Sequence, residues 1–194
     1  MRLSLLVAAA LLCCCVAAEA DPVTYTLTGT FTGTIGALSF TSDPGSITLQ
    51  ADTSGITDQG GGFYTNTDGV SSITLAGIGT AVFLSSTFGA YSASYAAGFY
   101  DISNSFGADD YDPLDPALAN YALTAPFTDT GFLLFGSPSA SELTSLGELM
   151  MAGDFGSSVT FTAVATGPSP EPSSFILLGT GLVGFAGLAR MRSH

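Results

Sequence analysis

The stretch from Asp21 to Pro170 contains no lysine, arginine, histidine or cysteine, and this absence limits what the chain can fold into. The same stretch carries fourteen aspartates and glutamates. Basic residues, the histidine and the cysteines all lie outside it, at Arg2, Arg190, Arg192, His194 and 13–15. Disulfides and internal salt bridges therefore cannot stabilise this region. The packing of uncharged side chains must hold it together.

The missing residue types also exclude most enzyme and cofactor chemistry. A serine nucleophile needs a histidine or lysine base, and zinc and copper sites need histidine or cysteine ligands. The formal net charge of −13 opposes binding to nucleic acid. Paired-carboxylate chemistry of the glycosidase kind remains open, but the chain has no tryptophan to stack on a sugar, and no carboxylate pair stands out. We expect a protein that is not an enzyme and needs no cofactor.

The amino-terminal segment has the features of a cleaved signal peptide. Arg2 precedes an apolar run over 3–16, and Ala18 and Ala20 form the small-x-small pattern that signal peptidase recognises. The run is shorter than the ~20 residues of a membrane span, which argues against a retained transmembrane helix. A lipoprotein cysteine within 13–15 is the other alternative, but no small residue precedes any candidate. We predict a signal peptide over 1–20 and export by the general secretory route.

The carboxyl-terminal segment is typical of a short membrane helix. Residues 175–189 are all apolar or small, and including Ser173 and Ser174 brings the segment near the lower length limit for a span. Arg190 and Arg192 follow at once, which places that end in the cytoplasm by the positive-inside rule. A buried helix of the folded domain is the alternative, but this segment has four glycines and no polar face. We predict a transmembrane helix over 173–189 with a basic end over 190–194.

The order of motifs in this tail resembles a known sorting signal. Pro170, Glu171 and Pro172 precede the apolar segment and the arginines, and together they resemble the PEP-CTERM sorting domain over 169–194. The resemblance implies processing near the Pro-Glu-Pro by exosortase, a membrane-embedded protease. It implies an inner-membrane intermediate with its cargo in the periplasm, followed by the cell surface or the extracellular matrix. The same tail is also labelled an ice-binding protein C-terminal domain, and the resemblance assigns no activity to the β-rich cargo.

Residues 21–168 form the cargo domain, which opens with a strict alternation. Over 23–35 apolar residues and glycines alternate with threonines, the pattern of a half-buried strand with its threonines outward. Seven further β-type runs, separated by turn signals, are 46–51, 70–76, 80–85, 94–102, 120–126, 131–135 and 158–165. We predict a mainly β fold, an antiparallel β-sandwich or jelly-roll-like domain of about eight strands.

Aromatic side chains and one helix complete the expected domain. The residues expected to fill the space between the sheets are Phe40, Phe83, Phe99, Phe127, Phe132 and Phe161. Ser139 and Glu142 form a capping box ahead of an apolar face, and Gly153 stands where a C-cap belongs. We predict one short helix near 140–151. Asp112-Pro113 and Asp115-Pro116 break the chain before the sixth strand, so residues 103–118 are expected to form a long loop.

Four aspartates gather in that expected loop. Asp109, Asp110, Asp112 and Asp115 lie within seven residues, and no base balances them. Carboxylate oxygens are ligands that Ca²⁺ prefers, although the spacing is not that of an EF-hand. A calcium site and a solvated acidic loop are both compatible with this pattern.

The sequence therefore predicts an exported protein that acts structurally in an extracellular polysaccharide matrix. Its expected partners are signal peptidase, exosortase, the membrane through the carboxyl-terminal helix, and exopolysaccharide. The alternative is a carbohydrate- or calcium-binding surface module with the same anchoring. Ice binding is a third option, suggested by the threonines of 23–35. It requires several such strands in register, and only this segment shows the full pattern.

Overall fold

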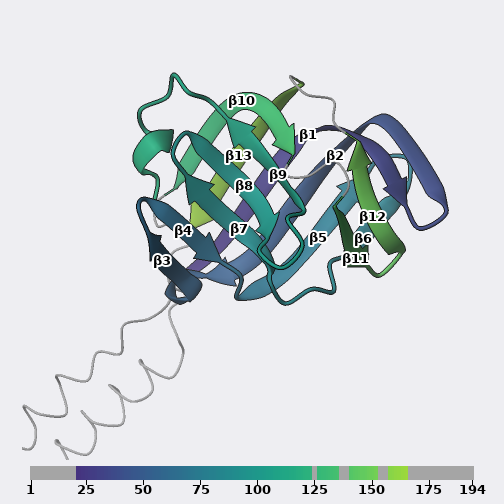
Figure 1. The fold of residues 1–194 in the computed structure, drawn as a ribbon, viewed down its shortest axis with the longest axis horizontal. Coiled ribbons are helices and arrows are strands. Elements are labelled where there is room, and N and C mark those ends of the chain that lie inside the picture. Colours follow the sequence, from purple (N-terminus) through teal and green to yellow (C-terminus); the bar gives the residue numbers. More distant parts are fainter. Residues whose placement is uncertain (1–20, 124–125, 136–139, 153–156, 166–194) are drawn as a thin grey trace, which may run out of the picture.

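The folded domain is built almost entirely of antiparallel β-strands (Figure 1). The computed structural model describes residues 21–123, 126–135, 140–152 and 157–165. The strands are β1 (Pro22–Ile35), β2 (Leu38–Asp52), β3 (Ile56–Gly60), β4 (Phe63–Asn66), β5 (Gly69–Leu75), β6 (Gly79–Val82), β7 (Phe88–Ala93), β8 (Ala96–Asp101), β9 (Gly107–Tyr111), β10 (Phe127–Phe135), β11 (Ser141–Thr144), β12 (Gly147–Ala152) and β13 (Ser158–Ala165). The helices within these residues are two 3-10 turns, η1 (Thr53–Gly55) and η2 (Leu118–Asn120).

The described strands join into one hydrogen-bonded sheet. Its order is β3-β4-β7-β8-β9-β10-β13-β1-β2-β5-β6, and the β11–β12 hairpin branches from β1. The prediction of a mainly β antiparallel fold is confirmed. The prediction of about eight strands is wrong, because the sheet has thirteen. Several of the additional strands are short and rich in glycine or aspartate, residue types that β-propensity disfavours, so they carry little signal of their own.

Strand β1 is the centre of the sheet. It pairs with β2 along nearly its whole length, with β13 along its first half and with β12 along its second half. The apolar positions Tyr25, Leu27 and Phe31 are buried, as the alternation over 23–35 predicts, whereas the threonines between them are partly or fully exposed. The inward side chains of β1 thus belong to the hydrophobic core.

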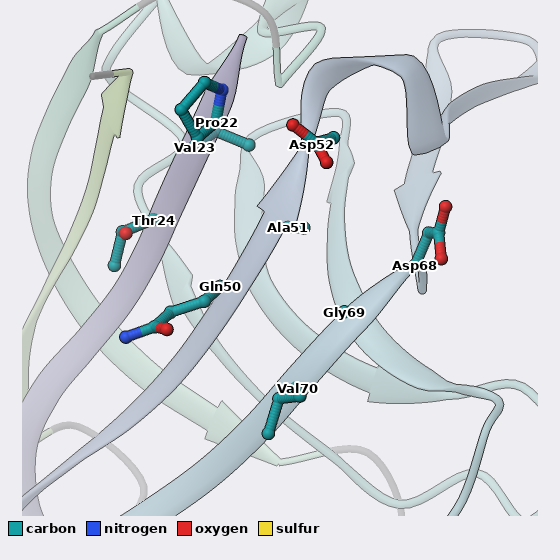
Figure 2. A pocket seen from close by; sticks show the side chains of 9 residues that line it. All are labelled: Pro22, Val23, Thr24, Gln50, Ala51, Asp52, Asp68, Gly69 and Val70. Atoms are coloured by element: carbon teal, nitrogen blue, oxygen red, sulfur yellow. The ribbon is translucent and has the colours of Figure 1, made fainter. Parts of the chain in front are cut away.

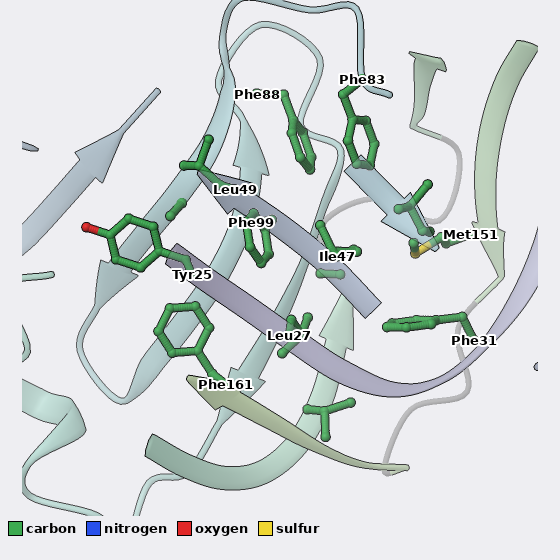
Figure 3. Close-up of a cluster of buried hydrophobic side chains, with 14 of the residues drawn as sticks. Tyr25, Leu27, Phe31, Ile47, Leu49, Phe83, Phe88, Phe99, Met151 and Phe161 are labelled. Atoms are coloured by element: carbon green, nitrogen blue, oxygen red, sulfur yellow. The ribbon is translucent and has the colours of Figure 1, made fainter. Parts of the chain in front are cut away.

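The hydrophobic core lies between two parts of this sheet, which folds over on itself. Strand β1 contacts β8, and β5 contacts β7, although neither pair is hydrogen-bonded. Figure 3 shows Phe99 and Phe161 beside Tyr25 and Leu27 in this space. Stacked aromatic rings extend the core. The ring centroid of Phe88 lies 3.9 Å from that of Phe83 and 6.0 Å from that of Phe99.

Most of the aromatic residues predicted to fill the core do so, and one does not. Phe40, Phe83, Phe99 and Phe161 are buried, and Phe127 packs partly against the core. Phe132 is 56% exposed, which contradicts the prediction. Successive residues of a strand point to opposite faces, and in β10 the inward position belongs to the fully buried Leu133.

The helix predicted near 140–151 is also wrong. These residues form the β11–β12 hairpin, in which Ser141 pairs with Met150 and Thr144 with Gly147. The side chains of the expected apolar helix face, Leu143, Leu146 and Met150, are exposed. Pairing of β12 with β1 decides the outcome, since long-range sheet hydrogen bonds outweigh a local capping box.

Two further segments differ from the sequence-based expectation. The loop expected over 103–118 contains β9, which pairs with β8 and β10. The strand expected over 120–126 is absent from its described part, where η2 ends at Asn120 and Leu123 has a positive φ of 61°. Prolines at 113 and 116 suggested that the chain stays irregular from 103 onward, but they lie after β9 and do not interrupt it.

The described residues include no helix that is long and apolar enough to span a membrane. The predicted transmembrane helix over 173–189 and the signal peptide over 1–20 lie outside the described residues.

Replacing Phe161 tests the position of the core. Phe161→Ala removes a fully buried ring that contacts Tyr25 and Phe99, and we expect it to lower the free energy of unfolding by about 3–5 kcal/mol in denaturant titrations. Val164→Ala, on the exposed face of the same strand, is the matched control, with an expected change within about 0.5 kcal/mol. Equal effects of the two substitutions would contradict the assigned faces of β13.

Candidate functional site

The structure separates two neighbouring aspartates that the sequence grouped together. Asp109 and Asp110 are consecutive in β9, so their side chains point to opposite faces of the sheet. Asp109 faces Tyr91, and burial raises the pKa of its carboxyl to about 6, against a smaller lowering by a hydrogen bond with Tyr91. Asp109 is therefore not on the side of the sheet where the other predicted ligands lie.

Asp110 points into the protein and has an unsatisfied oxygen. Its side chain is 0% exposed, and the amide of Phe161 donates to Oδ2 at 3.3 Å. Among the described residues, no donor reaches Oδ1 in good hydrogen-bonding geometry, although the nearby Gly131 amide, like that of Phe161, partly lowers the pKa of this carboxyl. A Cβ on Gly131 would overlap this oxygen, so the glycine makes room for it. Burial raises the pKa of Asp110 to about 7, and the nearby charge of Asp129 adds to this effect.

Asp129, which the sequence analysis did not select, completes an acidic cluster with Asp110, Asp112 and Asp115. It lies on β10, and its buried Oδ2 has no partner in good hydrogen-bonding geometry among the described residues. Burial raises the pKa of Asp129, and its contact with Asp115 and the nearby charge of Asp112 add to the rise. The cluster therefore holds three of the four predicted ligands. Within the described residues, no three acidic side chains converge closely enough to form a ready-made metal site. Asp129 was missed because only strand pairing brings it to the other three.

Asp112 and Asp115 also stabilise the loop that follows β9. Oδ1 of Asp112 accepts a hydrogen bond from the amide of Leu114 at 2.8 Å, and Oδ1 of Asp115 accepts one from the amide of Ala117 at 2.7 Å. These contacts are typical of aspartate-stabilised turns. Each carboxylate keeps further acceptor capacity, since an ionised carboxylate has about four lone-pair sites.

A second pair of buried carboxyl groups, Asp101 and Glu142, was not predicted either. Asp101 is 0% and Glu142 is 2% exposed. The hydroxyls of Ser85, Thr87 and Ser103 donate to Asp101 at 2.6 to 2.7 Å, and the Ser103 amide adds a fourth bond at 2.7 Å. Three segments thus meet at this pair: the loop between β6 and β7, the end of β8 with the residues that follow it, and the start of β11.

The two carboxyl groups of this pair have opposite pKa shifts. Burial alone would raise the pKa of Asp101, but the hydrogen bonds from Ser85, Thr87 and Ser103 hold it below its ordinary value. Burial raises the pKa of Glu142 to about 7, and contact with Asp101 adds to the rise despite a bond from Asn104 Nδ2 at 2.8 Å. Near neutral pH, Glu142 can therefore carry a proton while Asp101 stays ionised.

An open groove of about 490 Å³ lies at one end of strands β1, β2 and β5. Figure 2 shows its lining, which is Pro22, Val23, Thr24, Gln50, Ala51, Asp52, Asp68, Gly69 and Val70. None of these side chains is aromatic or basic. The groove contains neither the acidic cluster nor the Asp101–Glu142 pair, so the buried acids do not line it.

The predicted processing residues cannot be placed in the fold. Ala18, Ala20, Pro170, Glu171, Pro172, Arg190 and Arg192 lie outside the described residues. The last described strand, β13, ends at Ala165, shortly before the Pro-Glu-Pro.

Comparison with known protein families identifies the tail. Residues 170–192 match the PEP-CTERM protein-sorting motif, which confirms the resemblance found in the sequence. This motif implies secretion, membrane-associated sorting to the cell surface, and exosortase as the processing partner. No curated protein and no solved structure matches the chain.

The raised pKa of Glu142 predicts a fall in stability as pH rises. The folded state holds this proton more tightly than the unfolded state, whose pKa is near the ordinary 4.5, so the free energy of unfolding falls between about pH 4.5 and 7. Asp109 and Asp110 act in the same direction. Asp101 acts oppositely below about pH 4, because its lowered pKa favours the ionised folded state. We expect the thermal midpoint to be highest in mildly acid solution.

Glu142→Gln measures how much the proton on Glu142 contributes to the pH dependence of stability. Glutamine keeps the shape of the side chain and can donate to Asp101, but it does not titrate. We expect the variant to lose less stability than the wild type between pH 5 and 8, by several degrees in thermal midpoint. Identical profiles for the two proteins would show that Glu142 does not hold a proton in the folded state.

Proposed function

We propose that this chain is a structural protein of the cell surface or extracellular polysaccharide matrix, delivered there by exosortase-dependent sorting. The observation that carries the proposal is the PEP-CTERM motif over 170–192, which follows the folded domain with few residues between. A sorting motif at this position would leave the β domain intact after cleavage.

The proposed route uses both ends of the chain. Signal peptidase cuts after Ala20, and the helix over 173–189 holds the intermediate in the inner membrane with its cargo in the periplasm. Arg190 and Arg192 stay on the cytoplasmic side, in keeping with the positive-inside rule. Exosortase then cuts near the Pro-Glu-Pro, and the cargo domain reaches the surface.

A structural and non-catalytic role is supported by what the folded domain offers chemically. Between Asp21 and Pro170 the sequence supplies no histidine, lysine, arginine or cysteine for acid-base or nucleophilic catalysis. The carboxyl pair Asp101 and Glu142 is almost completely buried and does not flank the groove. Glycosidase carboxylates must reach both faces of a bound sugar, which this pair does not do.

The uniformly negative charge of the domain is compatible with a structural role in the matrix. Fourteen acids without a base repel one another and other acidic molecules, which keeps such domains soluble and apart. A neutral polysaccharide, rather than nucleic acid or an acidic polymer, is the partner that this charge permits. Salt screens the repulsion between exposed acids, with a Debye length of about 8 Å at physiological ionic strength.

Calcium binding is a second candidate function, favoured by one specific observation. Asp110 Oδ1 and Asp129 Oδ2 are buried carboxylate oxygens without hydrogen-bond partners, and Asp112 and Asp115 lie close to them. A bound Ca²⁺ would neutralise these charges and supply the missing partner, since hard oxygen ligands suit this ion. Binding would have to draw the side chains together.

Changing the sorting motif tests the main proposal. In cells with exosortase, we expect the Pro170→Ala, Glu171→Ala, Pro172→Ala triple variant to accumulate as uncut precursor in membranes, with at least tenfold less mature protein outside the inner membrane. Immunoblots of membrane and surface fractions measure both forms. Pro168→Ala, just outside the matched residues, is the control and should be processed normally. Normal processing of the triple variant would refute the proposed sorting.

Calcium titration of the purified full-length chain in detergent tests the second candidate. Added Ca²⁺ should raise the thermal midpoint of the wild type by several degrees, because a ligand that binds only the folded state stabilises it. Asp129→Asn and Asp110→Asn should abolish the rise. Asp109→Asn, next to Asp110 but on the other face, is the matched control and should retain it.

Calorimetry supplies an independent readout for variants with low stability. If Ca²⁺ changes neither the midpoint nor the heat of the wild type, or if KCl at equal ionic strength has the same effect, calcium binding is wrong. Loss of the response in Asp109→Asn would instead favour the ligand set predicted from sequence.

A further inference from the structure

Strand pairing aligns hydroxyl side chains into a row that crosses six strands. The register pairs Thr130 with Thr160, Thr160 with Thr28, Thr28 with Ser46, Ser46 with Thr74, and Thr74 with Thr80. This row therefore runs over β10, β13, β1, β2, β5 and β6. At about 4.8 Å between strands, its length is roughly 24 Å.

A second row lies beside the first, two residues along each strand. It consists of Thr128, Thr162, Thr26, Thr48 and Ser72, with Val82 in the sixth position. All residues of both rows are partly or fully exposed, and their strand neighbours Leu27, Ile47 and Ile73 point into the core. We name these two rows the hydroxyl face. The threonines of 23–35 stand out in the sequence because they alternate without interruption, whereas the hydroxyls of the other strands come together only through strand register.

The hydroxyl face retains free hydrogen-bonding capacity. Thr74 Oγ1 and Thr80 Oγ1 lie 2.9 Å apart, as do those of Thr130 and Thr160, and either oxygen of each pair can be the donor. Each hydroxyl has one donor and two acceptor sites, so one donor of each of these two pairs remains for a ligand. Thr28 Oγ1 and Thr162 Oγ1 instead donate to the carbonyls of Thr160 and Thr26, at 3.3 Å and 3.5 Å, and can accept hydrogen bonds from a ligand. The face can thus both donate and accept hydrogen bonds, as a polyhydroxylated ligand requires.

The surroundings of the hydroxyl face include an exposed aromatic ring on one side and a groove on the other. Neither of its two rows contains an acidic residue, although the domain carries fourteen aspartates and glutamates. Phe132 follows Thr128 and Thr130 on the outward side of β10 and is 56% exposed. On the other side of the face, Thr24 pairs with Gln50 and Gln50 with Val70, and these three residues line the groove in Figure 2.

We propose that the hydroxyl face, with Phe132 at one border and the Gln50 groove at the other, binds an extended neutral polysaccharide. Hydroxyl rows exchange hydrogen bonds with the sugar hydroxyls, and the Phe132 ring packs on an apolar sugar face. This inference rests on the proposed matrix role and names the ligand class for it.

Two other occupants fit the hydroxyl face less well. An ice surface requires a flat array, whereas neighbouring strands in a sheet typically rotate by roughly 20–25°, so a row of six strands turns through about 100–125°. An acidic polysaccharide would be repelled by the net charge of the domain. A flexible neutral chain can follow the twist and meets no charge on the two rows.

A depletion assay tests the proposal with the uncut full-length chain in a detergent that has no sugar headgroup. The probes are insoluble cellulose, chitin, β-1,3-glucan and starch, with calcium alginate as the acidic comparison. We expect at least one neutral polysaccharide to retain the wild type. Thr28→Val and Phe132→Ala should each weaken retention by about threefold to tenfold, the loss expected for one hydrogen bond or one ring contact.

Matched variants and alternative outcomes make the assay decisive. Leu114→Ala removes an apolar side chain that is 87% exposed and belongs to neither hydroxyl row, and it should bind like the wild type. The proposal is overturned if no neutral polysaccharide retains the chain, if alginate retains it equally, or if both face variants bind normally. It is also overturned if the wild type inhibits ice recrystallisation but binds no polysaccharide, and if Thr28→Val loses that inhibition.

The assay is independent of the sorting experiment. It uses uncut chain, so absence of binding would leave exosortase processing untouched. Conversely, normal processing of the Pro-Glu-Pro variant would refute the sorting route without affecting the measured retention.

Discussion

The pairing of β1 with three other strands is the interaction on which the rest of the domain depends. Strand β2 follows β1 in the chain, but β12 and β13 return to it from more than a hundred residues away. Their inward residues, Met151 of β12 and Phe161 of β13, join Leu27 and Phe31 of β1 in the core. The pairing also keeps residues 147–152 extended, and it aligns the outward threonines of β1 with those of β13.

The absence of basic residues forces each buried acid to be stabilised without a counter-ion from the domain. Asp101 receives four hydrogen bonds, chiefly from hydroxyls, and remains an anion. Glu142 beside it favours its protonated form. Asp110 and Asp129 keep oxygens without partners, which leaves protons or an external cation to satisfy them. Burial therefore shifts the pKa values of these carboxyl groups, whereas the exposed acids contribute mainly to the negative net charge of the domain and to its repulsion of other acidic molecules.

Local pattern predicted the elements whose side chains alternate strongly and failed where the fold overrode local preference. The strands over 23–35 and 158–165 were found because apolar and polar residues alternate along them. Strand β9 was missed because Asp109 and Asp110 are poor strand formers and read as loop. The acidic site was found in part, since proximity in sequence identified Asp110 and its loop but could not reveal Asp129 across the sheet.

By itself, the sequence determined the sorting tail, the β class of the domain, the lack of cations within it and the outward threonines of its first strand. These are properties of composition, order and short-range periodicity. Tertiary structure decided which acids meet and which hydroxyls share a face. Both depend on strand register, and a shift of one residue would turn every side chain to the opposite face. Register is set by the packing of the whole core, so no single segment encodes it.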